Sequence, residues 1–162
     1  MNAPPEEKVY LLDANVLFDL SLWLPISLNK NFWAKLEEAL QNGAWVLLDA
    51  VVDEIKYDND GLKKWCEEQK KKGLMQSIDD SHKSRGVEIN NQYKMIDETT
   101  QRSTVDTYLI ACAEAHGLAV LSREGYRKNP NDLYKIPDVC KALNVKIVRK
   151  PREFFEAIGY RN

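Results

Sequence analysis

Short apolar runs alternate along the chain with segments of helical periodicity. Four short, strongly apolar runs recur: "VYLL" at 9–12, which has no polar alternation, "AWVLL" at 44–48, "LAVL" at 118–121 and "VKIV" at 145–148. Continuous apolarity over so few residues is typical of parallel strands buried on both faces. The segments 31–43 and 103–117 carry apolar residues at helical spacing and end in glycine, which predicts helices. Strands that alternate with helices predict an α/β fold with a central parallel sheet of four to five strands.

The region between the second and third runs has a different composition. Residues 58–102 are charged and favour helix, with "KKWCEEQKKKG" followed by "SHKSRGVEINNQYKMIDETTQR". We expect two or three helices here, inserted between the second and third strands. The lysine run at 70–72 is interpreted as a solvated helix end. The sequence contains no obvious linker, so we expect a single domain over residues 1–162.

Composition and charge narrow the function only slightly. Of the 162 residues, 44% are apolar, 23 are basic and 25 are acidic, which gives a net charge of −2. This balance argues against a protein that binds nucleic acid by charge alone, but it allows a nucleic-acid enzyme that uses metal ions. No apolar run approaches the roughly 20 residues of a membrane span, and no signal peptide opens the chain. The three cysteines form no metal-like pattern and are interpreted as free thiols of a cytoplasmic protein.

Acidic side chains follow the predicted strands at the edge where a parallel sheet binds ligands. Asp13 comes directly after the first run, and Glu124 lies just beyond the third. Glu54 is expected in the helix after the second strand, and Asp106 at the start of the next predicted helix. The topology would bring these four acids to one crevice. Clustered carboxylates repel one another unless a cation neutralises them, and Mg²⁺ or Mn²⁺ is the ion that oxygen ligands favour.

Asp106, and Asn15 near Asp13, also have local structural interpretations. Asp106 fits a capping box in "STVD", with Ser103 as the N-cap residue, and the local sequence does not decide between capping and chemistry. Asn15 is expected to cap the helix that follows Asp13.

Three further acids are interpreted as structural. Asp49 ends the second strand and is a natural N-cap for the helix that follows. Asp53 in that helix is expected to point to solvent. Asp138 follows Pro137 in "IPDVC", a standard helix opening, which we favour over a place in the crevice.

The order of these motifs resembles the PIN-domain superfamily of metal-dependent ribonucleases, which includes the VapC-type toxins of bacterial toxin–antitoxin pairs. The likeness rests on "DAN" at 13–15, the Glu of "VVDEI", the Asp of "VDTYLIACAEAHG" and "SRE" at 122–124. The family usually has Thr-x-Asp at the last of these motifs. The likeness runs from Val9 to about Gly159, and the segment with "IPDVC" is similar to a less-studied bacterial branch.

The resemblance implies a three-layer α/β/α fold and hydrolysis of an RNA phosphodiester bond, leaving 5′-phosphate and 3′-hydroxyl ends. Asp13, Asp106 and Glu124 would hold Mg²⁺ or Mn²⁺, and Glu54 would complete the cluster or orient the attacking water. The supporting residues would be Asn15 and Ser122.

The resemblance also suggests partners. An RNA substrate is expected, together with a cognate antitoxin protein and a homodimer, and no membrane association. Scattered basic residues would contact the RNA, namely Arg123, Arg127 and Lys128. The four tryptophans are interpreted as core or interface residues, although an exposed ring can stack on an unpaired base.

Two other function classes stay open. A phospho-acceptor of the receiver or haloacid-dehalogenase kind also has an Asp after its first strand. The dehalogenase motif needs a second acid where this chain has Asn15, and the acid pair and late lysine of a receiver are not found. The second class is a catalytically silent PIN module that acts through protein or RNA binding, because Glu124 replaces the usual Asp.

Overall fold

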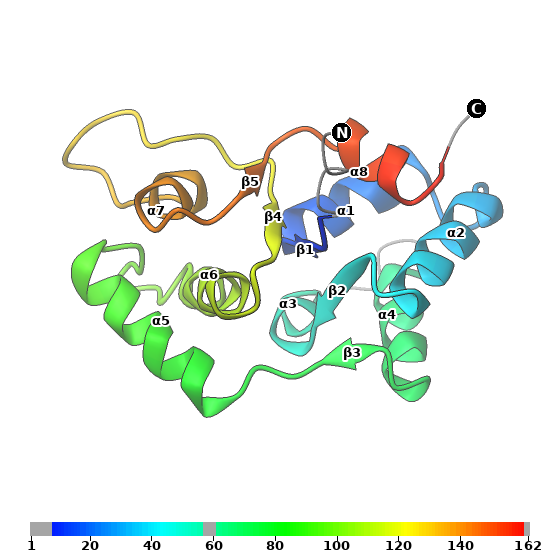
Figure 1. Cartoon of the computed structure of the whole chain (residues 1–162), viewed down its shortest axis with the longest axis horizontal. Coiled ribbons are helices and arrows are strands. Elements are labelled where there is room, and N and C mark those ends of the chain that lie inside the picture. Colours follow the sequence, from blue (N-terminus) through cyan, green and yellow to red (C-terminus); the bar gives the residue numbers. More distant parts are fainter. Residues whose placement is uncertain (1–7, 57–60, 161–162) are drawn as a thin grey trace, which may run out of the picture.

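The computed structural model describes residues 8–56 and 61–160 and contains a five-stranded sheet. Its strands are β1 (Tyr10–Leu12), β2 (Trp45–Leu48), β3 (Met75–Gln76), β4 (Ala119–Leu121) and β5 (Ile147–Val148). The strand order is β3-β2-β1-β4-β5, and every neighbouring pair is parallel (Figure 1). The predicted α/β class and parallel sheet are confirmed, and four of the strands lie in the four apolar runs.

Helices cover both faces of this sheet. One face carries α3 (Asp49–Asp53), α6 (Thr104–His116) and α7 (Ile136–Ala142), and α5 (Asp80–Gln92) packs on the outer side of α6 (Figure 1). The other face carries α1 (Ala14–Trp23), α2 (Lys30–Gln41), α4 (Leu62–Lys71) and α8 (Arg152–Ala157) (Figure 1). The molecule therefore has the three-layer α/β/α arrangement that was expected.

The core explains why the central strands are apolar throughout. All three residues of β1 and all three of β4 are buried, since helices cover both sides of the sheet. An aromatic cluster fills the space between the sheet and the helices of the second face. Trp45 stacks on Trp65, and its indole Nε1 donates a hydrogen bond of 2.9 Å to the carbonyl oxygen of Leu36. Three of the four tryptophans are buried, as expected, but Trp23 is 43% exposed.

The inserted segment differs in one respect from the sequence prediction. It contains two helices, α4 and α5, but also the strand β3, which was not predicted. Met75 and Gln76 are only half-buried, and they pair with Leu47 and Leu48 at the edge of the sheet. Two half-buried residues give no periodic signal, so pairing with β2 decides their conformation. Residues 58–60 of the predicted insertion lie outside the described residues.

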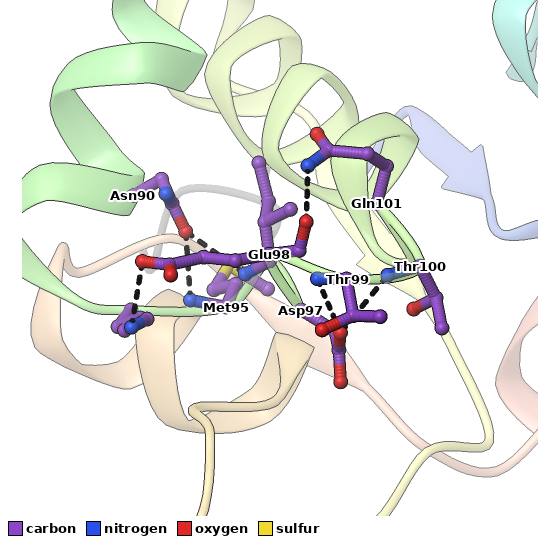
Figure 2. Close-up of polar contacts among 9 residues, drawn as sticks. Asn90, Met95, Asp97, Glu98, Thr99, Thr100 and Gln101 are labelled. Carbon is purple, nitrogen blue, oxygen red and sulfur yellow. Dashed lines mark hydrogen bonds and ion pairs between the residues drawn. The ribbon is translucent and has the colours of Figure 1, made fainter.

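The connection between α5 and α6 is organised by its own side chains (Figure 2). The carboxamide oxygen of Asn90 accepts hydrogen bonds of 2.9 Å from the N–H groups of residues 95 and 96. The carboxylate of Asp97 accepts hydrogen bonds from the N–H groups of residues 99 and 100 (Figure 2). Gln101 and Ser103 then adopt left-handed conformations, with φ angles of 57° and 72°. This ordered turn fixes the start of α6, where Asp106 lies.

Candidate functional site

Asp13 occupies a buried position at the carboxyl edge of the sheet. It follows β1 directly, is only 4% exposed, and its backbone N–H donates a 3.0 Å hydrogen bond to the carbonyl oxygen of Leu121 in β4. The hydroxyl of Ser122 donates to its Oδ2 at 3.0 Å. Burial raises the pKa of Asp13, whereas this hydroxyl and the N–H groups of Ala14 and Asn15 favour the charged form. The carboxylate is therefore desolvated but oriented.

Ser122 connects Asp13 to the second acid, Glu124. The Ser122 side chain is fully buried, and its oxygen accepts a hydrogen bond of 3.2 Å from the backbone N–H of Glu124. Burial and the charge of Asp13 raise the pKa of the Glu124 carboxyl, while the ammonium of Lys135 opposes this rise. Because β1 and β4 are parallel neighbours, the residues that follow these strands lie side by side.

The charges of the other three acids affect the pKa of Asp106. Burial is the largest cause that raises its pKa to about 8, followed by the negative charges of Asp13, Glu124 and Glu54. Ser103 does occupy the N-cap position of α6, but its side chain makes no capping hydrogen bond to the helix. The capping box therefore does not form, although a hydrogen bond from the Ser103 side chain to the Asp106 carboxyl works against the rise in its pKa.

The sequence predicted that Glu54 lies one turn inside a helix. In the structure it lies immediately after α3. α3 ends at Asp53, and Glu54 is its C-cap residue. The apolar residues around it, Val51, Val52 and Ile55, are buried as expected. Glu54 keeps part of its surface exposed, yet burial of the remainder and the charge of Asp13 raise its pKa to about 7.

The four acids thus share one electrostatic environment without forming a tight cluster. Among the residues that the structure describes, three potential ligand atoms within 4.8 Å of one another are found only at His82, Cys112 and His116, in a different place. Carboxylates that raise one another's pKa are the donor set that a hard divalent cation neutralises. Oxygen donors with a hydroxyl in support fit Mg²⁺ or Mn²⁺ better than they fit a thiophilic ion.

Asp49, an acid near this edge, serves the fold. The Oδ1 of Asp49 accepts hydrogen bonds from the N–H groups of Ala50, at 2.6 Å, and Ile78, at 3.0 Å. Asp49 is the first residue of α3, and the N-cap is Leu48, so the N-cap prediction is wrong by one position. Asp53 is exposed, as expected.

Asp138 is likewise a structural acid. It lies in the first turn of α7, after Pro137, and its Oδ2 accepts hydrogen bonds of 3.0 Å from the N–H groups of Lys135 and Arg127. The helix-opening interpretation is confirmed. The same bond from Arg127 ties the loop that follows β4 to the start of α7.

Asn15 has a different position from the one predicted. The N-cap of α1 is Asp13, so Asn15 lies inside the helix, exposed to solvent. Its side chain lines a pocket of about 500 Å³ next to Glu124. Asp19 and Trp23 line the same pocket, one and two turns further along α1. The sequence prediction did not include these two residues, although Asn15, Asp19 and Trp23 follow one another at intervals of four residues, which places all three on one helix face.

Arg123 is the basic residue that faces this pocket. Its guanidinium carbon lies 4.6 Å from the centre of the Trp23 ring, and its Nε is 3.6 Å from Asp19 Oδ2. Arg127 instead packs 3.7 Å above the Tyr134 ring and donates to the carbonyl oxygen of Pro130. Arg127 therefore holds its own loop together.

A larger pocket lies elsewhere on the molecule. It has a volume of about 710 Å³ and is lined by residues 27–32, 34, 35 and Tyr160. No acidic side chain is present in its lining among the residues that the structure describes. The carboxylates and the Arg123–Trp23 pair identify the sheet edge as the better candidate site, since chemistry needs functional groups more than volume.

The sequence model of a family described as a domain of unknown function (DUF4411) matches residues 10–161. The chain belongs to this family. A search of curated proteins finds no match to the chain. The matched range includes all four acids and the pocket beside Glu124, so the candidate site lies within the DUF4411 domain. None of the described helices is long and apolar enough to cross a membrane.

Proposed function

We propose that this DUF4411 protein is a metal-dependent endoribonuclease of the PIN type, which hydrolyses RNA phosphodiester bonds. The observation that supports the proposal is the shared environment of Asp13, Glu54, Asp106 and Glu124. Each of these carboxyls has a raised pKa, and the charge of at least one of the other three contributes to each rise except that of Asp13. Repulsion between carboxylates does not stabilise a fold. Acids gathered in one place are, in contrast, what a site for a divalent cation needs.

The chain supplies defined roles around such an ion. Asp13, Asp106 and Glu124 would hold Mg²⁺ or Mn²⁺, which when bound polarises a phosphoryl oxygen and activates water. Ser122 orients Asp13 through its 3.0 Å hydrogen bond and so fixes the direction of that ligand. Glu54 lies at the more solvent-exposed side of the group and would accept a hydrogen bond from the attacking water.

The pocket beside Glu124 supports nucleic acid as the substrate. Arg123 offers a guanidinium for a phosphate group, and the 43% exposed Trp23 offers a ring on which an unpaired base can stack. The ion pair of Arg123 with Asp19 is partly exposed, so a phosphate can replace Asp19 at small cost. A net charge of −2 fits a protein that binds RNA through this local site rather than through a broad basic surface.

The biological setting is part of the proposal and rests on the PIN resemblance alone. In this setting the protein is a cytoplasmic toxin of a bacterial type II toxin–antitoxin pair, with a cognate antitoxin and a homodimer as partners. A catalytically silent module that binds RNA or protein is the alternative, and the length of Glu124 is the reason to keep it, because its extra methylene shifts the carboxylate oxygens.

Cleavage of RNA in the presence of Mn²⁺ tests the proposal directly. Wild type and Asp106→Asn would be incubated with a pool of fluorescently labelled RNAs, with Mn²⁺ or with a chelator. We expect cleavage by wild type that the chelator abolishes, products with 5′-phosphate and 3′-hydroxyl ends, and a loss of at least about 100-fold in Asp106→Asn.

Asp53→Asn is the matched control, because Asp53 is an exposed acid next to Glu54 and outside the proposed site. It should cleave like wild type. Equal cleavage by wild type and Asp106→Asn would point to a contaminating nuclease and contradict the proposal. RNA binding that needs neither Mn²⁺ nor Asp106, with no cleavage, would favour the silent module.

A further inference from the structure

A second group of potential metal ligands lies between α5 and α6, away from the four acids. Nε2 of His82 is 3.2 Å from Nε2 of His116, and one ring nitrogen of each histidine and the sulfur of Cys112 all lie within 4.8 Å of one another. Cys112 and His116 are four residues apart on α6, so they lie on one face of that helix. His82 comes from the first turn of α5 on the opposite side.

Close packing of the two helices brings these side chains together. At Gly86 of α5 the packing against α6 leaves no room for a side chain, because an added Cβ would lie 2.8 Å from the Thr107 hydroxyl oxygen. Arg85 of α5 then makes a two-pronged contact with Glu114 of α6, with bonds of 2.7 and 3.1 Å. The ligand atoms therefore sit on two helices whose separation is fixed by these contacts next to the group.

We propose that His82, Cys112 and His116 bind a metal ion of intermediate softness, of which Zn²⁺ fits best, and that a water molecule completes the coordination. Two imidazole nitrogens and a thiolate are the donors that Zn²⁺ prefers. In a tetrahedral site with Zn–N bonds of about 2.0–2.1 Å, two nitrogens lie about 3.3 Å apart. The observed 3.2 Å between the two imidazoles matches this spacing. His82 and Cys112 are buried but His116 is exposed, so the fourth position opens to solvent.

Asp79 completes the arrangement around His82. In the metal-free protein, Nδ1 of His82 accepts a hydrogen bond of 3.2 Å from the N–H of Asp79, which places the ring proton on Nε2, toward His116. Oδ1 of Asp79 lies 3.3 Å from the same Nδ1. A metal ion at Nε2 would require the ring proton on Nδ1, where it would be donated to this carboxylate in place of the bond that Nδ1 now accepts from the Asp79 N–H. A carboxylate behind a metal-binding histidine is the usual way to fix the ring and increase its basicity.

Loss of the thiol proton gives the site a second signature. The sulfur of Cys112 binds a metal ion as the thiolate, so binding displaces the thiol proton into solvent. We therefore expect protons to be released when the ion binds, and this release should be lost in Cys112→Ser.

The structure also offers a simpler role for one of the three residues. His82 closes a capping interaction with Asp79 at the start of α5, which explains a histidine there without any metal. It does not explain why the facing turns of α6 present Cys112 and His116 to it. The chain has only two histidines, and both are in this group.

Titration of the full-length protein with Co²⁺ tests the site, because a cobalt–thiolate bond gives a charge-transfer band that oxygen ligands do not. We expect one equivalent of Co²⁺ to produce the band and one equivalent of Zn²⁺ to abolish it. The band should be lost in Cys112→Ser. In His116→Gln the affinity for Co²⁺ should be about 100-fold weaker. Calorimetry in buffers of different ionisation enthalpy should show proton release when Zn²⁺ binds wild type.

Cys140→Ser is the matched control, since Cys140 is also a fully buried free thiol and lies on α7. It should keep the band, as should Asp106→Asn at the carboxylate site. His116 is exposed, so His116→Gln should fold even if Cys112→Ser does not. No thiolate band in wild type would overturn the proposal, as would a band of unchanged affinity in His116→Gln. Excess Zn²⁺ should also raise the thermal midpoint of wild type by about 5–10 °C and leave His116→Gln nearly unchanged.

Discussion

The carboxyl of Asp106 is expected to destabilise the metal-free protein as the pH rises. Burial and the charges of Asp13, Glu124 and Glu54 raise its pKa from the ordinary value of 3.8 to about 8. In the unfolded chain the same carboxyl titrates near the ordinary value. Between about pH 4 and pH 8, the folded chain therefore holds a proton that the unfolded chain has released. The contribution of this group to stability is greatest below about pH 4 and is lost as the pH rises to about 8.

The size of the effect follows from the size of the pKa change. One pKa unit corresponds to about 1.4 kcal/mol, so a rise from 3.8 to about 8 sets an upper limit of about 6 kcal/mol. Asp106 is only partly buried, and solvent screens some of this cost. We therefore expect Asp106→Asn, which removes the charge but keeps the shape, to raise the free energy of unfolding by about 2–3 kcal/mol at pH 8.5. In a domain of this length, that corresponds to about 5–10 °C in the thermal midpoint.

Urea and thermal denaturation at pH 4.5, 7 and 8.5, with a chelator present, provide the measurement. Asp106→Asn should match wild type at pH 4.5 and exceed it increasingly at the two higher values. Asp53→Asn, an exposed acid of α3, should stay within about 0.5 kcal/mol of wild type throughout.

Divalent cation should cancel most of this difference at high pH. At a Mn²⁺ concentration 100 times its dissociation constant, wild type gains about 2.7 kcal/mol, a gain that Asp106→Asn largely forfeits. If metal-free Asp106→Asn were less stable than wild type by an amount independent of pH, the reasoning would be wrong. The charged carboxylate would then be stabilising the start of α6 as a helix cap.

Three further substitutions test other parts of the structure. Ser122→Ala removes the hydroxyl that orients Asp13, so we expect about 10-fold weaker Mn²⁺ binding by calorimetry and a loss of about 1–2 kcal/mol in urea denaturation. Gly86→Ala places a Cβ 2.8 Å from a threonine oxygen of α6 and should cost about 1–3 kcal/mol, whereas Gly125→Ala, with 3.6 Å to its nearest neighbour, should cost little. Trp23→Ala should weaken the binding of single-stranded RNA by about 5- to 100-fold, measured by fluorescence anisotropy, and leave Mn²⁺ binding unchanged.

The strands that could be predicted are those buried on both faces. β1 and β4 are apolar at every position because helices cover both sides of the sheet, and this leaves a clear signal in the sequence. β3 leaves none, since its two residues are half-buried and owe their conformation to pairing with β2. α3 is also too short for periodicity to mark its end, and for this reason Glu54 was expected inside a helix rather than at its C-cap.

The candidate site was predictable as far as it follows from strand ends. Asp13 and Glu124 were expected at one edge because they come after strands that were expected to be parallel, and the structure places them there with Ser122 between them. Trp23 was not expected in the site, although its helical spacing from Asn15 carried the signal. Cys112 was interpreted as a free thiol outside any metal-like pattern.

The group of His82, Cys112 and His116 was not predicted because its members come from two separate segments of the chain. Cys112 and His116 have a spacing that suits one helix face, but His82 precedes them by 30 residues or more and meets them only through the packing of α5 on α6. The capping box that the local sequence allowed at Ser103 does not form for a related reason. The left-handed backbone of Ser103, at a φ of 72°, is set by the turn that leads into α6 rather than by the local motif.

Helix α6 carries both proposed metal sites, and their donor sets keep them chemically separate. At a rise of about 1.5 Å per residue, Cys112 and His116 lie about 9 Å and about 15 Å along the helix from Asp106. Mg²⁺ and Mn²⁺ gain little from thiolate and imidazole, whereas Zn²⁺ and Co²⁺ prefer these donors to carboxylates. The ion that would serve hydrolysis and the ion that would join α5 to α6 therefore do not compete strongly. The thiolate band reports ion binding at the Cys112 site alone, so failure of one proposal leaves the other to stand or fall on its own measurement.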